Sequence, residues 1–175
     1  SLDQHLKANA ASESFCSHPD SVVHLDTGTW KPSFVKQYEV AWALRPEVDA
    51  WLAKYIAAGI IGPAPAGCAW NSPLIVVPKK DSSGKKTKVR ICLDPRPINA
   101  MLEDDNFPLH LINDMLETSA FCEYFSTMNL KDSFYQFPLA AEDRIKTAFT
   151  WNGQQYMFYG APFGLKPLPS IYCNG

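Results

Sequence analysis

The sequence lacks any apolar run near the roughly 20 residues that span a bilayer, and its N-terminus lacks the basic-then-apolar pattern of a signal peptide. It also lacks a sizeable net charge, because 16 Lys and Arg residues stand against 18 Asp and Glu residues. The first absence argues against a membrane partner, and the second gives no overall electrostatic preference for nucleic acid. We therefore expect an intracellular protein of the cytoplasm or nucleus.

Metal-binding cysteine patterns are also missing. There is no CxxC pair and no Cys/His spacing that suits zinc. An odd, scattered set of thiols predicts small core residues in a reducing compartment, with no structural metal. The five are Cys16, Cys68, Cys92, Cys122 and Cys173.

Apolar residues make up 46% of the chain and aromatic residues 13%, which is ample for a packed core. The polar start predicts a flexible lead-in over residues 1–21, followed by one folded domain over 22–175. Residues 22–28 (VVHLDTG) favour a short strand or an extended arm. No internal repeat is present.

Two segments have helical spacing. Over 46–59, Pro46 suits a first helical turn and Gly59 a helix end. Over 109–120, apolar residues recur at intervals of three and four. The predicted apolar face of the first helix consists of Val48, Trp51, Leu52, Tyr55 and Ile56.

Strand patterns predict hairpins at 73–94 and 146–159, and the second has Asn152-Gly153 at a type I′ turn. Residues 62–67 (GPAPAG) indicate a loop. Residues 125–139 favour two short strands, or a strand and a turn. Helices mixed with hairpins predict an α+β fold.

The first hairpin is strongly basic, with seven cations against Asp81 and Asp94 between residues 79 and 96, an excess of five positive charges. Two interpretations stay open: a solvated hairpin tip, or a finger that contacts phosphates, because clustered cations neutralise them and release counterions. The cations are Lys79, Lys80, Lys85, Lys86, Lys88, Arg90 and Arg96.

The motifs resemble, in order and spacing, the first half of a reverse transcriptase of gypsy-type LTR retrotransposons, with retroviral enzymes as more distant relatives. The resemblance implies the fingers and part of the palm of a right-hand polymerase. In the family the later palm hairpin, the thumb and RNase H follow further along the chain. The matching stretches are residues 22–28, 58–81, 88–99, 105–116, 124–150 and 155–165.

The resemblance also implies roles for residues of a nucleotide site. Arg90, with one of the lysines at 79–88, stands where the family meets the triphosphate of the nucleotide. Asp94 and Arg96 match a family pair, for which a structural ion pair and a substrate contact stay equally open. Phe134 matches an aromatic that lies beneath the sugar and would exclude a 2′-hydroxyl, with plain core packing as the alternative.

Gly164 matches a turn near the template and the incoming base, where close backbone approach requires a residue without Cβ. After it the match weakens, because Lys166-Pro167-Leu168-Pro169 replaces a small polar run. We expect the two prolines to delay or distort the helix that the family has there.

Asn129 stands where the family has a metal-ligating aspartate. Polymerases of this family hold two Mg²⁺ ions with palm carboxylates, and an amide supplies no charge. Asp132 would project to the opposite face of a strand. The pair Asp104-Asp105 precedes the helix, which is the wrong place for the family's later Asp-Asp pair, and that pair is not among these residues.

We therefore expect no intact catalytic residue, no bound metal and no cofactor. Our first hypothesis is an inactive, domesticated domain retained as a binding or regulatory module, with a protein partner or a second copy of itself at an exposed palm edge. The alternatives are a module that binds RNA or an RNA–DNA duplex through the basic hairpin, and a fragment of an active, Mg²⁺-dependent RNA-directed DNA polymerase.

Overall fold

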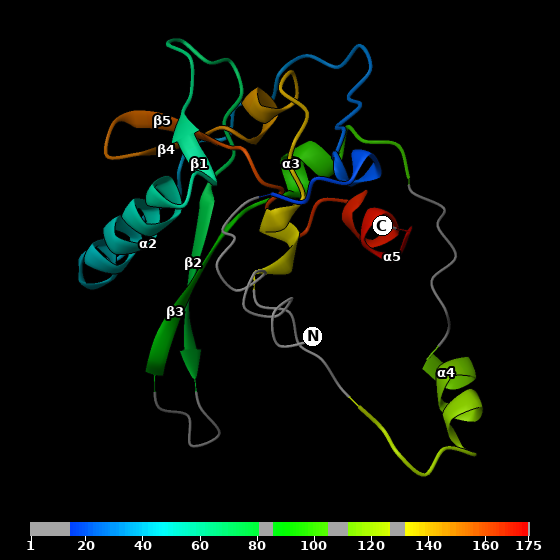
Figure 1. Ribbon diagram of the computed structural model, residues 1–175. Coiled ribbons are helices and arrows are strands. Elements are labelled where there is room, and N and C mark those ends of the chain that lie inside the picture. The colour runs from blue at the N-terminus through cyan, green and yellow to red at the C-terminus, as the bar shows by residue number, and fades with distance from the viewer. Residues whose placement is uncertain (1–14, 81–85, 105–111, 127–131, 175) are drawn as a thin grey trace.

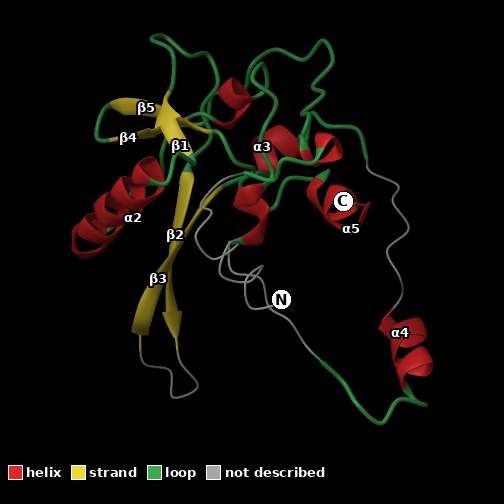
Figure 2. Ribbon diagram, in the orientation of Figure 1, coloured by secondary structure: helices red, strands yellow, loops and turns green. Residues whose placement is uncertain are grey.

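The computed structural model describes residues 15–80, 86–104, 112–126 and 132–174. They form an α+β arrangement, as predicted (Figure 1), and Figure 2 distinguishes its helices from its strands. The helices are α2 (Arg45–Ala57), α3 (Arg96–Asn99), α4 (Ile112–Ser119) and α5 (Leu168–Asn174). The 3-10 turns are η1 (Pro19–Ser21), η2 (Trp42–Leu44), η3 (Ser133–Gln136) and η4 (Arg144–Thr147). The strands are β1 (Ile61–Pro63), β2 (Leu74–Lys80), β3 (Lys86–Leu93), β4 (Phe149–Trp151) and β5 (Gln154–Phe158).

The larger sheet has the strand order β1–β5–β4, and both neighbouring pairs are antiparallel. Asn152 and Gly153 connect β4 to β5 with φ values of 48° and 79°. Positive φ at both central residues is the mark of the predicted type I′ turn. The predicted hairpin is confirmed, with its first strand starting three residues late because η4 occupies the residues before it.

Helix α2 lies against this sheet. Val48, Leu52 and Tyr55 are buried, and the Trp51 ring lies 6.3 Å from the ring of Phe149. The helix ends as predicted before Gly59, which has a φ of 70°. Ile56, which we expected on the buried face, is exposed instead.

The predicted hairpin at 73–94 is confirmed as β2 and β3, which extend away from the rest of the molecule (Figure 1). Its core-side pairs are Leu74 with Leu93 and Val76 with Ile91. Leu74, Leu93 and Ile91 are buried. The root of the hairpin is therefore anchored in the core.

An extended arm joins the N-terminal residues to α2. Val23 forms a parallel bridge with Leu139, and Asn71 receives a hydrogen bond from the backbone N–H of Val35 at 2.8 Å. The expected strand or arm at 22–28 is thus an arm with an isolated bridge. Residues before it also contact the body, since the Cys16 N–H donates to the Gln136 carbonyl at 2.7 Å. The boundary at residue 21 stays a prediction.

Some local expectations are corrected. The loop at 62–67 begins inside β1, because residues 61–63 pair with β5. Residues 127–131 lie outside the described part of the chain; after them η3 supplies the turn of our second alternative, and Asp132 precedes it with a φ of 53°. The helix expected at 109–120 is described only as α4, and residues 105–111 lie outside the described part of the chain.

The two prolines after Gly164 do not prevent a helix. Helix α5 begins at Leu168, immediately after Pro167, and has Pro169 as its second residue. A proline in the first turn lacks an N–H that would have no intrahelical partner there anyway. The prolines are therefore compatible with a helix here, and a delay relative to the family stays a prediction.

The cysteine prediction is wrong for two of the residues that the structure describes. Cys68 is buried and Cys92 half-buried, whereas Cys16 and Cys122 are exposed. The side chain of Cys173 lies outside the described residues. Among the described helices, none combines the length with the apolar character needed to cross a membrane.

Candidate functional site

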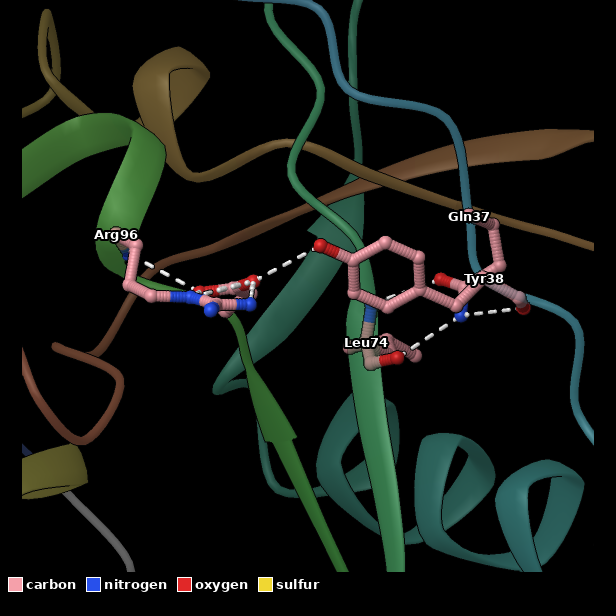
Figure 3. Close-up of polar contacts among 5 residues, drawn as sticks. Gln37, Tyr38, Leu74 and Arg96 are labelled. Carbon is pink, nitrogen blue, oxygen red and sulfur yellow. Dashed lines mark hydrogen bonds and ion pairs between the residues drawn. The ribbon is translucent and has the colours of Figure 1, made fainter.

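Asp94 is a buried carboxylate at the end of β3, where it meets Arg96 and Tyr38 (Figure 3). The Arg96 guanidinium donates from Nε to Oδ1 at 2.9 Å and from Nη2 to Oδ2 at 2.6 Å, and the Arg96 N–H also donates to Oδ1 at 3.1 Å. The Tyr38 hydroxyl donates to Oδ2 at 3.3 Å. The Arg96 side chain is 74% exposed and Asp94 1%, so a fixed carboxylate aims an accessible guanidinium outward.

These contacts shift the pKa values of both side chains. Hydrogen bonds from Arg96 lower the pKa of the Asp94 carboxyl below its ordinary value, against the opposing effect of burial. The same hydrogen bond raises the pKa of the Arg96 guanidinium. Asp94 therefore stays ionised and Arg96 stays cationic across the physiological range.

Gly164 lies against the loop that follows Asp94. Its φ is 92°, and a Cβ built on it would lie 2.9 Å from Cγ of Pro95. Asn99 at the end of α3 holds this turn from both sides: its Nδ2 donates to the Gly164 carbonyl at 2.8 Å, and its Oδ1 accepts from the Lys166 N–H at 3.0 Å. Two segments about 65 residues apart are thereby locked together.

The aromatic part of the site comes from η3. The half-buried ring of Phe134 meets the ring of Phe163 edge-on at 5.3 Å, and Tyr135 meets the same ring at 5.1 Å. Phe163 directly precedes Gly164, so η3 and the Gly164 turn form one packed unit. We call Asp94, Arg96, Asn99, Phe134, Phe163 and Gly164 the central site.

The basic hairpin leads away from the central site. Arg90 is exposed on β3 and pairs in register with Val77. Lys79 pairs in register with Lys88, and Lys80 with Lys86, across a bulge. Cross-strand partners of like charge destabilise a hairpin. Lys85 lies outside the described residues, as do the side chains of the other four lysines.

Asn129 also lies outside the described residues, so its role stays a prediction. Asp132 is described, and its carboxylate faces α2. It forms a hydrogen bond with Tyr55 and lies 3.8 Å from Nζ of Lys54. Burial, helped by Asp132, raises the pKa of Tyr55 to about 12. Asp132 thus acts in packing η3 onto α2, and the expectation that it does not replace a carboxylate at 129 stays a prediction.

The described residues contain one group with metal-ligand chemistry: the ligand atoms of His24, Glu142 and Asp143 lie within 4.8 Å of one another. Both carboxylate oxygens of Asp143 already have partners within the chain: Oδ2 accepts the Leu25 N–H at 2.9 Å, and Oδ1 pairs with the Lys146 ammonium at 2.7 Å. We interpret this group as the anchor of the arm. The Asp104 carboxylate is likewise paired, with Lys166 at 2.7 Å, and Asp105 lies outside the described residues.

Two residues of the central site, Phe163 and Asn99, and the adjoining Tyr38 were not predicted from the sequence. Tyr38 lies 56 positions from its partner Asp94, so no local pattern could reveal it. Phe163 reads as an ordinary core aromatic. Asn99 did carry a signal, since it ends the matching stretch 88–99 and a polar residue at a helix end commonly binds backbone.

Comparison with known proteins agrees with the resemblance. The chain is 32% identical over 146 residues to the retrovirus-related Pol polyprotein from transposon opus of Drosophila melanogaster, covering 83% of this chain and 14% of the relative. It is 36% identical over 143 residues to that of transposon 412, covering 81% and 11%. It is 33% identical over 144 residues to that of transposon gypsy, covering 81% and 14%. No family model matches the chain.

Solved structures share the fold. The protease-reverse transcriptase of prototype foamy virus matches with a TM-score of 0.73 at 24% identity, covering 99% of this chain and 24% of that one. A foamy viral protease-reverse transcriptase in complex with an RNA/DNA hybrid matches with a TM-score of 0.70 at 20% identity, covering 99% and 23%. The same kind of protein in complex with double-stranded DNA matches with a TM-score of 0.67 at 24% identity, covering 87% and 28%.

The fold and the sequence together define a reverse-transcriptase-like chain. It is related to the Pol polyproteins of gypsy-type LTR retrotransposons, as the motifs predict. The chain spans 14% or less of the length of the three curated relatives described above.

Proposed function

We propose that this reverse-transcriptase-like chain binds nucleic acid through the basic hairpin and the central site, and that Asn129 leaves it unable to supply the metal charge that polymerisation needs. The observation that carries the proposal is the junction of Asp94–Arg96 with the Gly164 turn. It presents a cation and a close-approach glycine on one rigid unit, held by Asn99.

The hairpin supports the binding part. The backbone register pairs Lys79 with Lys88 and Lys80 with Lys86, so four cationic residues share one short hairpin, and clustered cations favour a bound polyanion. Exposed Arg90 and Arg96 extend the positive charge toward the central site. Guanidinium groups suit phosphate oxygens, with which they form paired, charge-assisted hydrogen bonds. Solved structural relatives bind double-stranded DNA and an RNA/DNA hybrid.

The central site supports a nucleotide-contacting role in the same surface. Phe134 is half-buried against Phe163, so part of its ring is accessible while its position is fixed. A fixed aromatic of this kind can exclude a 2′-hydroxyl. We therefore assign Phe134 to sugar discrimination and Gly164 to close approach of the base.

The catalytic part of the proposal rests on the sequence. Asn129 replaces the carboxylate that the family places on its first metal-binding strand, and Asp132 is held by α2. Loss of a ligand charge at a two-metal centre costs several kcal/mol of transition-state stabilisation, or a rate factor on the order of 10³ or more. Mg²⁺ would matter only if a carboxylate stood at 129.

A second function, self-association, is favoured by one observation. Phe121, Tyr124, Phe125 and Leu116 are exposed in or just after α4, which Figure 1 shows apart from the other elements. Residues 112–126 carry three acids and no Lys or Arg. A second copy of the chain fits, because its basic hairpin complements this acidic, apolar segment. Sedimentation velocity of Phe121→Ser/Tyr124→Ser should show about tenfold weaker association, whereas an unchanged monomeric profile would remove this candidate.

The binding proposal is tested with a fluorescently labelled RNA–DNA hybrid. The association constant measured by fluorescence anisotropy should fall steeply as the salt concentration rises. A plot of its logarithm against the logarithm of the salt concentration should have a slope of about −0.7 to −0.9 for each phosphate that is neutralised. Arg96→Ala should weaken binding by about tenfold, because it removes an exposed guanidinium held by Asp94. Lys54→Ala, which removes a charge on α2 far from the hairpin in sequence, is the control and should leave affinity nearly unchanged.

Two outcomes would refute the binding proposal. One is the absence of measurable hybrid binding at low salt. The other is binding that ignores salt and loses equal affinity in the Arg96→Ala and Lys54→Ala variants. Each variant is assayed at a temperature at which its thermal unfolding curve shows it fully folded, so that a loss of affinity is not a loss of fold.

A further inference from the structure

We propose that the arm between η1 and α2 carries a binding site for single-stranded nucleic acid, made by a row of exposed aromatic rings. The row consists of Trp30, Phe34, Tyr38 and Trp42, which recur at every fourth residue and are 65%, 55%, 47% and 82% exposed. It rests on the proposed nucleic-acid function, and it adds a surface and a strand type that the central site does not specify.

The backbone explains why these rings face outward. The arm is held from one side: the Asn71 N–H donates to the Ser33 carbonyl at 2.9 Å, and Gln37 exchanges hydrogen bonds with both backbone groups of Leu74 at 2.7 and 2.9 Å. In an extended segment alternate residues project to opposite faces. Residues 33, 35 and 37 are therefore half-buried against the body and Phe34 faces solvent, whereas Tyr38 leaves part of its ring exposed and places its hydroxyl on Asp94.

Exposure on this scale is unusual for large aromatic rings. Four residues of extended chain span roughly 13 Å, so Trp30, Phe34 and Tyr38 are separated along the arm rather than clustered, and Trp42 follows as the first residue of η2. Protein interfaces concentrate their aromatic anchors in a central, well-packed patch. Rings spaced along a line, with cations between them, suit a linear polymer whose bases stack on successive platforms.

The charge around the row favours a polyanion. Lys31 and Lys36 are exposed on the arm, and the Arg45 guanidinium lies 4.6 Å from the centre of the Trp42 ring. Glu39 is the one acid between residues 30 and 45, so this stretch has a net charge of two positive. Arg45 supports Trp42 from one face, while 82% of the residue stays accessible to a base.

The row also leads to features already described. The Tyr38 hydroxyl contacts Asp94, so the third ring touches the ion pair of the central site (Figure 3). Tyr38 also lines a cavity of about 360 Å³, together with residues that include Gln37, Glu39, Arg45, Thr150 and Trp151. This volume lies at the lower end for small-ligand sites and can accept a base. A single strand on the row would therefore approach the central site at Arg96.

The experiment compares a labelled single strand of about 15 nucleotides with a blunt RNA–DNA hybrid by anisotropy. Trp30→Ala, Phe34→Ala and Trp42→Ala should each weaken single-strand binding by about tenfold and leave hybrid binding within about twofold. Ile56→Ala, which removes an exposed apolar side chain of α2 outside the row, is the control and should change neither. A variant with all three alanine substitutions should bind the base-containing strand weakly. An abasic strand of equal length should bind the parent protein equally weakly.

A spectroscopic readout separates stacking from a structural effect. Binding of the single strand should quench tryptophan fluorescence, and Trp30→Phe and Trp42→Phe should remove most of the quenching while they keep a ring. The rings are exposed, so these variants should unfold at the parent temperature.

Several results would contradict the proposed single-strand site on the row. They are equal losses on hybrid and single strand, unchanged affinity in all three variants, or parental affinity for the abasic strand. Weaker self-association with unchanged nucleic-acid binding would make the row a protein contact and also contradict the inference. If the RNA–DNA hybrid does not bind but the single strand still binds, and that binding depends on the row, the proposed function is refuted and the row is not.

Discussion

The central site contains a buried carboxylate, whereas the sequence around Asn129 has an amide where the family has a carboxylate. Asp94 is buried, ionised and held by Arg96 and Tyr38, and it serves to aim a cation. At position 129, which the resemblance matches to a metal-ligating aspartate, the sequence has an uncharged amide, and the nearest acid along the chain, Asp132, is held by Tyr55 and Lys54 of α2. On the proposed function, the chain has charges suited to holding phosphates and lacks the charge suited to holding a metal. Binding and chemistry can therefore be tested separately.

The largest effect should come from the hairpin. Replacing all five lysines at 79, 80, 85, 86 and 88 by Ala should weaken hybrid binding at 50 mM salt at least about a hundredfold. The salt slope should shrink by about one for each lysine that contacts a phosphate. Isothermal or anisotropy titrations at four salt concentrations measure both. An unchanged slope would mean that the hairpin tip is merely solvated, the alternative that the sequence left open.

The next effect concerns Asp94. Asp94→Asn should lower the free energy of unfolding by about 1–3 kcal/mol, because it leaves the hydrogen bonds of a buried site incomplete. The control is Asp104→Asn, whose carboxylate is exposed and should matter little. Urea unfolding measures the difference. Equal effects of the two substitutions would show that the Asp94–Arg96 pair is not a fixed unit.

The same pair predicts a pH dependence. The pKa of Asp94 is lowered in the folded protein, so its unfolded value, about 3.9, is the higher one. Its contribution to stability is therefore fully present above that pH and is lost as the pH falls through the lower folded value. Asp94→Asn should flatten the acid limb of stability between about pH 5 and pH 2. An acid limb identical in parent and variant would contradict the assignment.

A smaller effect is expected at the Gly164 turn. Gly164→Ala and Gly59→Ala both place a side chain at positive φ, which costs about 1–2 kcal/mol each. Only at Gly164 would the new Cβ also press on Pro95. We expect Gly164→Ala to be the more destabilising of the two and the only one that weakens hybrid binding. If both variants bind equally well, the turn is not part of the nucleic-acid surface.

Local signals explain which parts of the fold could be predicted. Asn152-Gly153 specifies its own turn, and Gly59 specifies the end of α2, so these elements were placed within a few residues. The hairpin root was predictable because Leu74, Ile91 and Leu93 alternate with outward residues. Asp132 escaped prediction, since a left-handed residue there depends on contacts with α2 rather than on its neighbours.

The site was only partly predictable for the same reason. Asp94, Arg96, Phe134 and Gly164 were named from their motifs, and the structure brings their segments together, while their roles stay predictions. Tyr38 and Asn99 act across 56 and 65 positions, where a single sequence gives no pairing information. The exposed Cys16 and Cys122 show the limit of composition, which predicts average burial and not individual positions.

The most direct test of the account is primer extension by the protein at its natural length, with Asn129 and with Asn129→Asp, on the same labelled RNA template whose binding is measured in parallel. The account predicts that both forms bind the primer–template equally. It also predicts that the Asn129 form extends the primer at least about 10³-fold more slowly than a reverse transcriptase that has the aspartate at this position and the later Asp-Asp pair. Extension by the Asn129 form at the rate of such an enzyme, supported by Mg²⁺, would contradict it.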